Sequence, residues 1–413
     1  MKMKKLLPIC MLLMTTILSS CSEPGNQQPI TLTFWSTASE GAQSDFFQER
    51  VNAFQEEHPN IVVNVVQVSF GSASNQFKTA ILGEQNIDVL RADNSWISEY
   101  ADLGIVHSLS SLATDEELSG YVDSAINADT YQGELYGLPS VLEAPALLYN
   151  KRILEEAGYT SPPATMDELL EIAESVTNES RYGIYVSDDS YFALPYIWAY
   201  GGGTIGDDRS IAIASEDSMK GLEFMLKLKQ EGVAQPYPDF ADGYNRMMDD
   251  FKTGRSAMII NGPWAGADIL AGSEFKDPAN LGVAQIPKGP KGQGSPIGGH
   301  SFIISKYSEH PKEAYELISY LTSAETQLLQ TQKHKTLPAQ KSVYEDPSLA
   351  NDPIIQGFKG QLDTAKTRPL IPEGAQMFTD FTPNLQDILL EKQTVKEGAA
   401  NIEAAWKSLL RVK

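Results

Sequence analysis

Acidic and aromatic side chains stand beside chain-breaking residues at three places in the sequence. Asp93 lies in "RADNSW" after an apolar run, Glu143 interrupts the apolar stretch "SVLEAPALLY", and Trp264 follows the turn-forming "NGP". Ionised carboxylates accept strong, charge-assisted hydrogen bonds, whereas flat aromatic rings cover C–H surfaces. The combination suits a ligand that carries both hydroxyl groups and apolar C–H faces.

Each of these residues also has a purely structural interpretation. Asp93 is equally suited to cap a helix that starts at "SWISEYA", and Trp264 is equally compatible with core packing. Glu143 could be a salt-bridged structural acid. A lone carboxylate in an apolar stretch is costly without a partner, which favours a ligand-binding role for Glu143.

The segments around Asp93 alternate between strand and helix patterns. Strands are predicted over 30–36, 61–70 and 87–92, with helices over 42–58 and 74–85. Such alternation indicates an α/β lobe with a parallel sheet, in which ligands bind beyond the carboxyl ends of the strands. The loops "STASEG", which contains Glu40, "GSAS" and "RADNSW" all occupy that position.

A second α/β pattern begins near residue 145. A strand runs into a helix over 145–158, an amphipathic helix follows Thr165 as its N-cap, and strands are predicted over 182–187 and 255–262. A strand and a helix follow within 301–323, and the tail over 382–410 is mostly helical. A chain of 413 residues is long enough for two or more domains.

Charge and cysteine content narrow the function further. The formal net charge of −22 disfavours binding to nucleic-acid phosphates. The two cysteines are Cys10 and Cys21, so the chain after residue 21 has no disulfide framework, thiolate metal site or thiol nucleophile. We expect neither a metal nor a cofactor.

The N-terminus has the layout of an export signal. Residues 1–20 combine a basic start, an apolar stretch and small residues, and "LSSC" resembles a bacterial lipobox that ends at Cys21. That resemblance implies a lipid on Cys21, with 21–29 as a flexible tether and the protein anchored on the outer face of the cell membrane. The alternative is an ordinary cleaved signal with an incidental cysteine.

Five segments, in their order, resemble one known family. They are "FWS" (34–36), "LPSVLEAPALLYNK" (138–151), "YGGG" (200–203), "FKTGRSAMIINGPWA" (251–265) and "IGGHSFIISKYS" (297–308). The chain is similar to the family 1 extracellular solute-binding proteins of carbohydrate ABC importers, and among them to maltose-, trehalose- and maltodextrin-binding proteins. The likeness covers about 30–410.

The resemblance implies a fold and a role. It implies a two-lobed α/β fold of the type II periplasmic-binding-protein kind, each lobe a mainly parallel sheet flanked by helices. The N-lobe would comprise 30–141 and 266–323, and the C-lobe 142–265 and 324–413, with hinges near 140–144, 262–267 and 321–324. The protein would be a non-enzymatic monomer that binds a sugar between its lobes and delivers it to a membrane permease.

The resemblance also implies roles for individual residues. Asp93, Glu143 and Trp264 match sugar-binding positions, as do Asp189, Tyr191 and Arg368, while Glu40 is a weaker candidate. Gly299 and His300 stand where relatives often carry Gly-Trp, so one stacking ring is replaced by a polar group. That exchange leaves the identity of the sugar open.

Two other functions compete with sugar binding. A receptor for a different solute, such as a peptide, a polyamine or a phosphate ester, would share the same leader and fold. A phosphate ligand would need several basic groups, whereas these loops are richer in acids. A glycoside hydrolase would need a pair of carboxylates with separated pKa values, and candidate acids are present.

Overall fold

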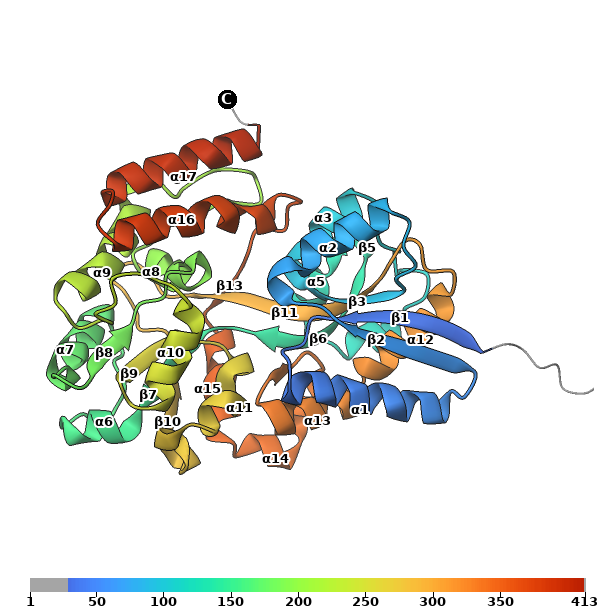
Figure 1. Ribbon diagram of the computed structural model, residues 1–413, viewed down its shortest axis with the longest axis horizontal. Helices are drawn as coiled ribbons and strands as arrows, with labels where there is room; N and C mark the ends of the chain where they lie inside the picture. The colour runs from blue at the N-terminus through green and yellow to red at the C-terminus, as the bar shows by residue number, and fades with distance from the viewer. Residues whose placement is uncertain (1–28, 412–413) are drawn as a thin grey trace, which may run out of the picture.

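The computed structural model describes residues 29–411, and within them the chain forms two main sheets (Figure 1). The first has seven strands in the order β12-β6-β11-β3-β1-β2, with β13 paired to β11; the second has four, in the order β10-β7-β9-β8. The first sheet contains β1 (Ile30–Ser36), β2 (Ile61–Gln67), β3 (Val89–Asp93), β6 (Gly137–Glu143), β11 (Ser295–Ile304), β12 (Leu337–Pro338) and β13 (Ala365–Thr367). The second contains β7 (Ala146–Asn150), β8 (Tyr182–Tyr185), β9 (Ser256–Asn261) and β10 (Leu281–Ala284), and a small hairpin joins β4 (Thr130–Tyr131) to β5 (Glu134–Leu135).

The first sheet is held between helices on its two faces. Leu32 and Phe34 of β1 are fully buried in the core that also contains α1 (Ala42–Glu57), whereas Trp35 points to the opposite face and packs edge-on against Phe77 of α2 (Phe70–Leu82). This follows from the two-residue period of a strand. Figure 1 shows α1 and α2 on either side of the strands. The other helices of this half are α3 (Ile97–Asp102), α4 (Asp115–Ser119), α5 (Asp123–Ala128), α12 (Pro311–Leu321) and α13 (Ala324–His334).

The second sheet is surrounded by the remaining helices. Thr165 caps α7 (Met166–Val176) by accepting a hydrogen bond from the Glu168 amide, which confirms the predicted helix start. The expected helical tail is divided into α16 (Met377–Leu389) and α17 (Val395–Leu409). The other helices here are α6 (Lys151–Glu156), α8 (Leu194–Ala199), α9 (Glu216–Gln230), α10 (Gly243–Lys252), α11 (Gly266–Leu270), α14 (Pro347–Ala350) and α15 (Pro353–Leu362).

Both sheets are mixed rather than mainly parallel. β1 pairs in parallel with β2 and β3, but β11 runs antiparallel to β3 and β6, and β7 runs antiparallel to β9 and β10. A parallel connection needs a crossover, usually a helix. β7 instead follows β6 after only Ala144 and Pro145, so it enters the second sheet with no helix before it.

Sheet membership departs from the expected lobe boundaries at three short strands. β10 lies in 266–323, which the resemblance assigns to the N-lobe, yet it pairs with β7 of the second sheet. β12 and β13 lie in 324–413, assigned to the C-lobe, yet they pair with β6 and β11 of the first sheet. The chain therefore leaves the second sheet after β10 rather than near 262–267, and it still contributes strands to the first sheet beyond 321–324, the last of them β13.

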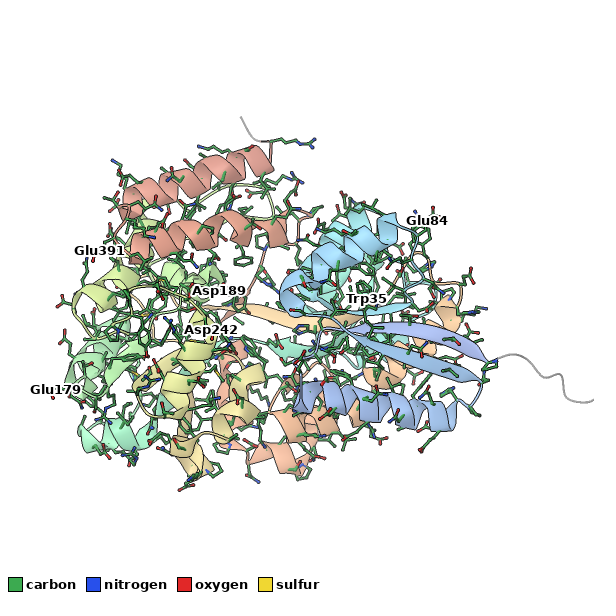
Figure 2. The ribbon with its side chains drawn as sticks, in the orientation of Figure 1. Trp35, Glu84, Glu179, Asp189, Asp242 and Glu391 are labelled. Carbon is green, nitrogen blue, oxygen red and sulfur yellow. The ribbon has the colours of Figure 1, made fainter. Side chains whose placement is uncertain are left out.

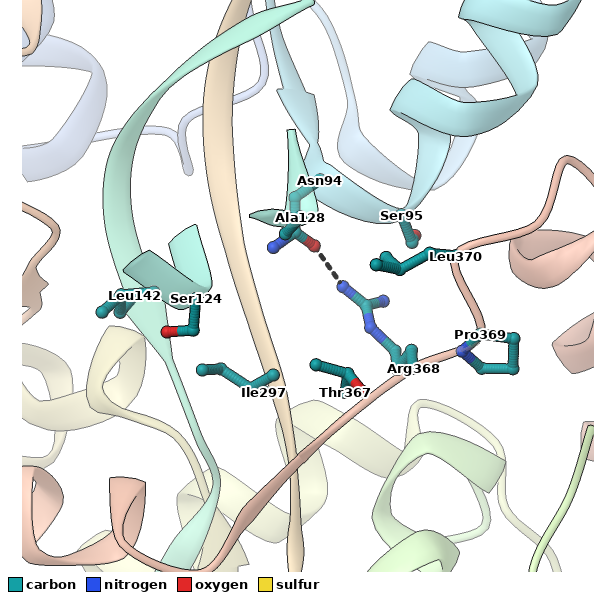
Figure 3. Close-up of a pocket in the computed structure, with 10 residues that line it drawn as sticks. All are labelled: Asn94, Ser95, Ser124, Ala128, Leu142, Ile297, Thr367, Arg368, Pro369 and Leu370. Carbon is teal, nitrogen blue, oxygen red and sulfur yellow. Dashed lines mark hydrogen bonds between the residues drawn. The ribbon is translucent and has the colours of Figure 1, made fainter. Parts of the chain in front are cut away.

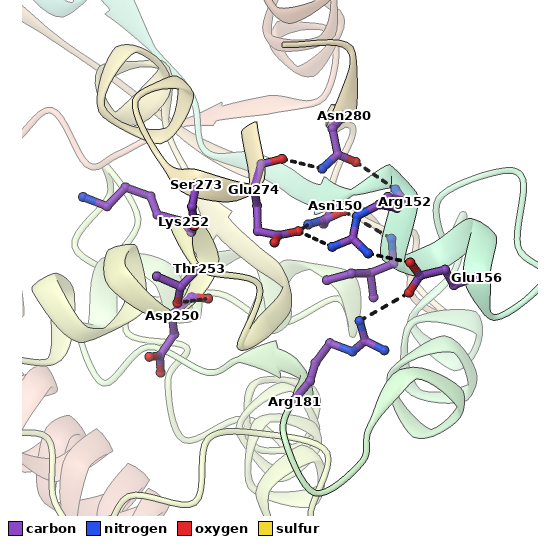
Figure 4. Close-up of polar contacts among 11 residues, drawn as sticks. Asn150, Arg152, Glu156, Arg181, Asp250, Lys252, Thr253, Ser273, Glu274 and Asn280 are labelled. Carbon is purple, nitrogen blue, oxygen red and sulfur yellow. Dashed lines mark hydrogen bonds and ion pairs between the residues drawn. The ribbon is translucent and has the colours of Figure 1, made fainter. Parts of the chain in front are cut away.

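A polar network explains why the segment before β10 stays with the second sheet (Figure 4). The Asn150 side-chain amide donates to the Glu274 carboxylate at 3.0 Å, and the Arg152 backbone amide donates to Asn280 at 2.8 Å. Arg152 also forms ion pairs with Glu274 and Glu156. These contacts tie residues 274–280 to the start of α6.

The expected signal peptide and lipidated Cys21 lie outside the described residues. Between residues 29 and 411, no helix has the length and apolar character needed to cross a membrane.

Candidate functional site

The candidate site lies where three parallel strands of the first sheet end. β1, β2 and β3 run side by side, so the residues that follow them share one edge of the sheet. Glu40 follows β1, Phe70 follows β2, and Asp93 is the last residue of β3. In Figure 1 this edge faces the half of the molecule built on the second sheet.

Asp93 and Arg368 form the best-defined polar contact of the site. Arg368 Nη2 donates to Asp93 Oδ1 at 2.9 Å and to Asn94 Oδ1 at 2.6 Å, and the Arg368 side chain is only 9 % exposed. Arg368 directly follows β13, whose parallel pairing with β11 directs it towards β3. Figure 3 shows Arg368 reaching Asn94 within a small pocket.

Asp93 also caps a helix, so its structural interpretation is confirmed. Its Oδ1 accepts hydrogen bonds from the Ser95 amide at 2.8 Å and the Ser95 hydroxyl at 2.6 Å, at the start of a 3-10 helix (Asn94–Trp96). Burial would raise the pKa of Asp93, but Arg368, His300 and the two hydrogen bonds from Ser95 together outweigh it and hold that pKa below its usual value. The Asp93 carboxylate is therefore ionised at neutral pH.

Glu143 and His300 form a second buried pair. His300 Nδ1 lies 3.4 Å from Glu143 Oε1, and the two side chains are 12 % and 10 % exposed. β11 carries His300 opposite Asp93 on one side and Val141 on the other. Gly299 is required by close approach, because a Cβ there would lie 2.2 Å from the Val141 carbonyl oxygen. Gly299 thus positions its neighbour His300.

Aromatic residues from the second half of the molecule complete the site. Arg368 lies over the Tyr191 ring, 5.7 Å from its centroid, and the Tyr191 ring is 6.4 Å from the Trp264 ring. Tyr191 Oη donates to the Pro296 carbonyl at 3.4 Å. Tyr191 therefore links the Asp93–Arg368 pair to Trp264.

Trp264 is positioned by the glycine that precedes its turn. A Cβ at Gly262 would lie 1.8 Å from the Trp264 ring, so the indole folds directly against the Gly262 backbone. Trp264 Nε1 donates to Tyr244 Oη at 3.0 Å. The side chain is half-buried, so part of the indole stays open to solvent.

Two predicted site residues stand apart from this group. Glu40 is exposed, and within residues 29–411 its side chain makes no hydrogen bond or ion pair with any other residue. The Asp189 carboxylate is exposed and accepts from the Tyr191 amide at 2.9 Å, capping a 3-10 helix (Ser190–Ala193). Figure 2 places Asp189 in the half that carries the second sheet.

Sequence reasoning missed two polar members of the site. Asn94 accepts from Arg368, and the buried Arg91 donates to Thr37 Oγ1 at 3.3 Å. Burial lowers the pKa of Arg91 to about 10, although Glu143 and Asp93 act in the opposite direction. Both residues stand in "RADNSW", so that motif was the signal that could have identified them.

Comparison with known proteins places the chain in a family. The family model described as bacterial extracellular solute-binding protein matches residues 38–328. The chain belongs to this family. The two-lobed α/β class expected from the sequence is thereby confirmed, together with the kinship to solute-binding proteins of carbohydrate ABC importers.

Several known proteins are similar to this chain over most of its length. The crystallised GacH receptor of Streptomyces glaucescens, described unliganded and in complex with acarbose, has a TM-score of 0.88 and 34 % identity, covering 94 % of this chain and 100 % of that one. A maltotriose-binding protein of Pyrococcus abyssi is 28 % identical to this chain. The matched region spans 81 % of this chain and 71 % of that protein. A galactooligosaccharide-binding protein of Bacillus subtilis is 24 % identical to this chain. The matched region spans 90 % of this chain and 88 % of that protein.

Proposed function

We propose that this protein captures a maltose- or trehalose-like gluco-oligosaccharide and delivers it to the permease of an ABC importer. The observation that carries the proposal is that Tyr191 contacts both Arg368 and Trp264. One small region thus offers charged hydrogen-bonding groups beside aromatic faces. The related proteins whose names mention oligosaccharides support the same class of ligand.

The charge balance of the site favours a neutral ligand over a polyamine. Asp93 is paired with the Arg368 guanidinium. A polycation would need carboxylates without positive neighbours, because a new ion pair at Asp93 would have to replace the existing one. Sugar hydroxyls can instead be added to this pair as further donors and acceptors.

The same pairing argues against a glycoside hydrolase. That reaction requires one carboxylic acid that keeps a proton at the working pH. The pKa of Asp93 is lowered rather than raised, so Asp93 is unsuited to that role. Burial raises the pKa of Asp129 to about 8, but Asp129 is fully buried and cannot reach a ligand, and Asp189, whose pKa burial also raises, stands apart from the Asp93–Arg368 pair. We therefore propose a binding protein that leaves its sugar chemically unchanged.

We further propose that the mature protein is a monomer anchored by a lipid on Cys21 at the outer face of the cell membrane. The support is the export signal over 1–20, the lipobox-like "LSSC" and the polar tether over 21–29. Replacing Cys21 with alanine should release the protein from the membrane fraction. Equal membrane retention of both forms would contradict the anchor.

We propose that the two halves close on the sugar by bending where the chain passes between the sheets. We propose one bend at 140–145, beside the expected hinge near 140–144, and the other two in the segment after β10 and around β12 and β13, a choice supported by the pairing of these strands. In this arrangement the Asp93, Glu143 and Gly299–His300 positions belong to one lobe and Trp264, Tyr191 and Asp189 to the other. Small-angle scattering should report a smaller radius of gyration when maltotriose is added.

Isothermal titration calorimetry tests the proposal directly. The wild-type protein is titrated with maltose, trehalose, maltotriose, galacto-oligosaccharides, spermidine and a short peptide. We expect heat with at least one sugar, and a loss of more than tenfold in affinity for both Trp264→Ala and Glu143→Ala. Binding of spermidine or the peptide with no response to any sugar would overturn the sugar assignment.

A further inference from the structure

Phe70 is an exposed aromatic residue at the edge of the first sheet where the site lies. It is the first residue of α2 and is 46 % exposed. The neighbouring phenylalanines of this half behave differently, since Phe34, Phe47, Phe54 and Phe77 are fully buried. An exposed phenylalanine ring at the end of β2 is therefore an exception to the packing of this sheet.

The Phe70 ring is held flat by its neighbours. It stacks on the Trp96 ring with a centroid distance of 5.3 Å and an interplanar angle of 25°. Trp96 is only 9 % exposed and belongs to the core cluster of Phe77 and Tyr100, so it forms a fixed base. One face of Phe70 is thus occupied, while almost half of the residue remains accessible.

The accessible ring borders the polar groups of the proposed site. His300 meets Phe70 at a centroid distance of 5.6 Å in an edge contact, and His300 Nδ1 lies 3.4 Å from Glu143 Oε1. On its other side His300 stands in register with Asp93. An apolar flat surface therefore lies against His300, whose own neighbours are two carboxylates, and one sugar ring needs such a combination for its C–H face and its hydroxyls.

We propose that Phe70 is a stacking platform for a sugar ring of the bound oligosaccharide, on the lobe opposite Trp264. This inference rests on the proposed function and specifies a further contact of the same site. Phe70 would bind the apolar face of a ring while Glu143 or Asp93 accepts its hydroxyl hydrogens. The ligand would then be held between aromatic residues of both lobes.

Calorimetry with maltotriose, on the full mature chain, tests this platform. Phe70→Leu keeps an apolar cover over Trp96 but removes the flat ring, Phe70→Ala removes both, and Phe70→Trp keeps a ring. We expect the affinity for maltotriose to fall by about tenfold or more in the leucine and alanine variants and to stay near the wild-type value in Phe70→Trp. Tyr307→Ala is the matched control, because Tyr307 is a 37 % exposed aromatic residue beyond the other end of β11.

The outcomes separate this inference from the proposed function. Suppose that the wild type binds maltotriose and that Trp264→Ala weakens this binding but Phe70→Leu does not. The platform is then refuted and sugar binding stands. A loss in Phe70→Ala alone also refutes it, because covering Trp96 would then be the whole role of Phe70. If the wild type binds no sugar, the proposed function fails together with the platform that rests on it. Circular dichroism and urea midpoints check that every variant is folded.

Discussion

Replacing Asp129 with asparagine should change how the stability of the protein depends on pH. Asp129 follows α5 and is fully buried. Its Oδ1 accepts a hydrogen bond from the Ser301 hydroxyl at 2.8 Å, while Oδ2 has no hydrogen-bond partner within the part of the chain that the structure describes. A Cβ at Gly137 would lie 3.1 Å from Oδ2, so β6 packs directly against this carboxyl group.

The sign of the effect follows from the direction of the pKa change. Burial raises the pKa of Asp129 to about 8, with the Ser301 hydrogen bond opposing and the charge of Asp93 adding to the rise. Below about pH 4 the group is protonated in both the folded and the unfolded chain. Above that pH the unfolded chain releases the proton first, so the free energy of unfolding falls as pH rises, until the folded group also ionises near pH 8.

The magnitude is set by the interval between the two pKa values. Each pH unit of that interval corresponds to about 1.4 kcal/mol, so the interval from 3.8 to about 8 corresponds to about 6 kcal/mol. Asparagine has nearly the same shape, keeps the acceptor for Ser301 and carries no titrating proton. The stability of Asp129→Asn minus that of the wild type should therefore rise by about 4 kcal/mol between pH 5 and pH 8.

Urea unfolding followed by circular dichroism at pH 5, 6, 7 and 8 measures this difference. Glu174→Gln is the control, because Glu174 is an exposed acid on α7 and the variant removes the same charge. We expect the Glu174→Gln curve to parallel that of the wild type. If the Asp129→Asn curve is also parallel to the wild type over this range, the buried carboxyl does not hold its proton and the reasoning is refuted.

Two further predictions concern the aromatic and ionic parts of the site. Gly262→Ala should weaken maltotriose binding by about tenfold, because the added Cβ would occupy the position of the Trp264 ring. Gly360→Ala is the control, because a Cβ there meets nothing within 4 Å, and it should leave the affinity unchanged. Equal calorimetric affinities of the two variants would argue against a positioned indole. Arg368→Ala should lower the free energy of unfolding by about 3 kcal/mol, because it leaves Asp93 buried without its partner. Adding Asp93→Ala should recover part of that loss in urea titrations, and a purely additive double variant would contradict the pairing.

Local patterns were sufficient to predict most elements of the first sheet. The alternation over 30–36 matches β1 residue for residue, and the helix expected over 42–58 is α1, because each pattern is set by neighbours a few residues apart. The boundary after β2 was misplaced. The sequence pattern predicts a strand that continues to Phe70 and a loop at "GSAS", whereas α2 starts at Phe70. An apolar residue at a strand end carries no local sign that it begins a helix.

Long-range pairing explains what the sequence could not predict. β10 is only four residues long, and its place beside β7 depends on a network around Asn150 and Glu274 that joins segments more than a hundred residues apart. Likewise, the acid in "RADNSW" and the arginine in "KTRPLIP" could each be suspected from the sequence. Their contact, between residues 275 positions apart, requires the tertiary fold.

The two interpretations of Asp93, helix cap and ligand-binding acid, are compatible because the carboxylate has two oxygens. Oδ1 accepts from the Ser95 amide, the Ser95 hydroxyl and Arg368, whereas Oδ2 accepts no hydrogen bond from any residue in 29–411. The bonds to Oδ1 fix the carboxylate plane and keep it ionised, so Oδ2 has a set orientation before a ligand arrives. A ligand hydroxyl would then meet an acceptor whose rotamer is already restricted, which lowers the entropic cost of binding. On this argument Ser95→Ala should weaken sugar binding although Ser95 itself need not touch the sugar, because it removes one of the bonds that hold the acceptor in place.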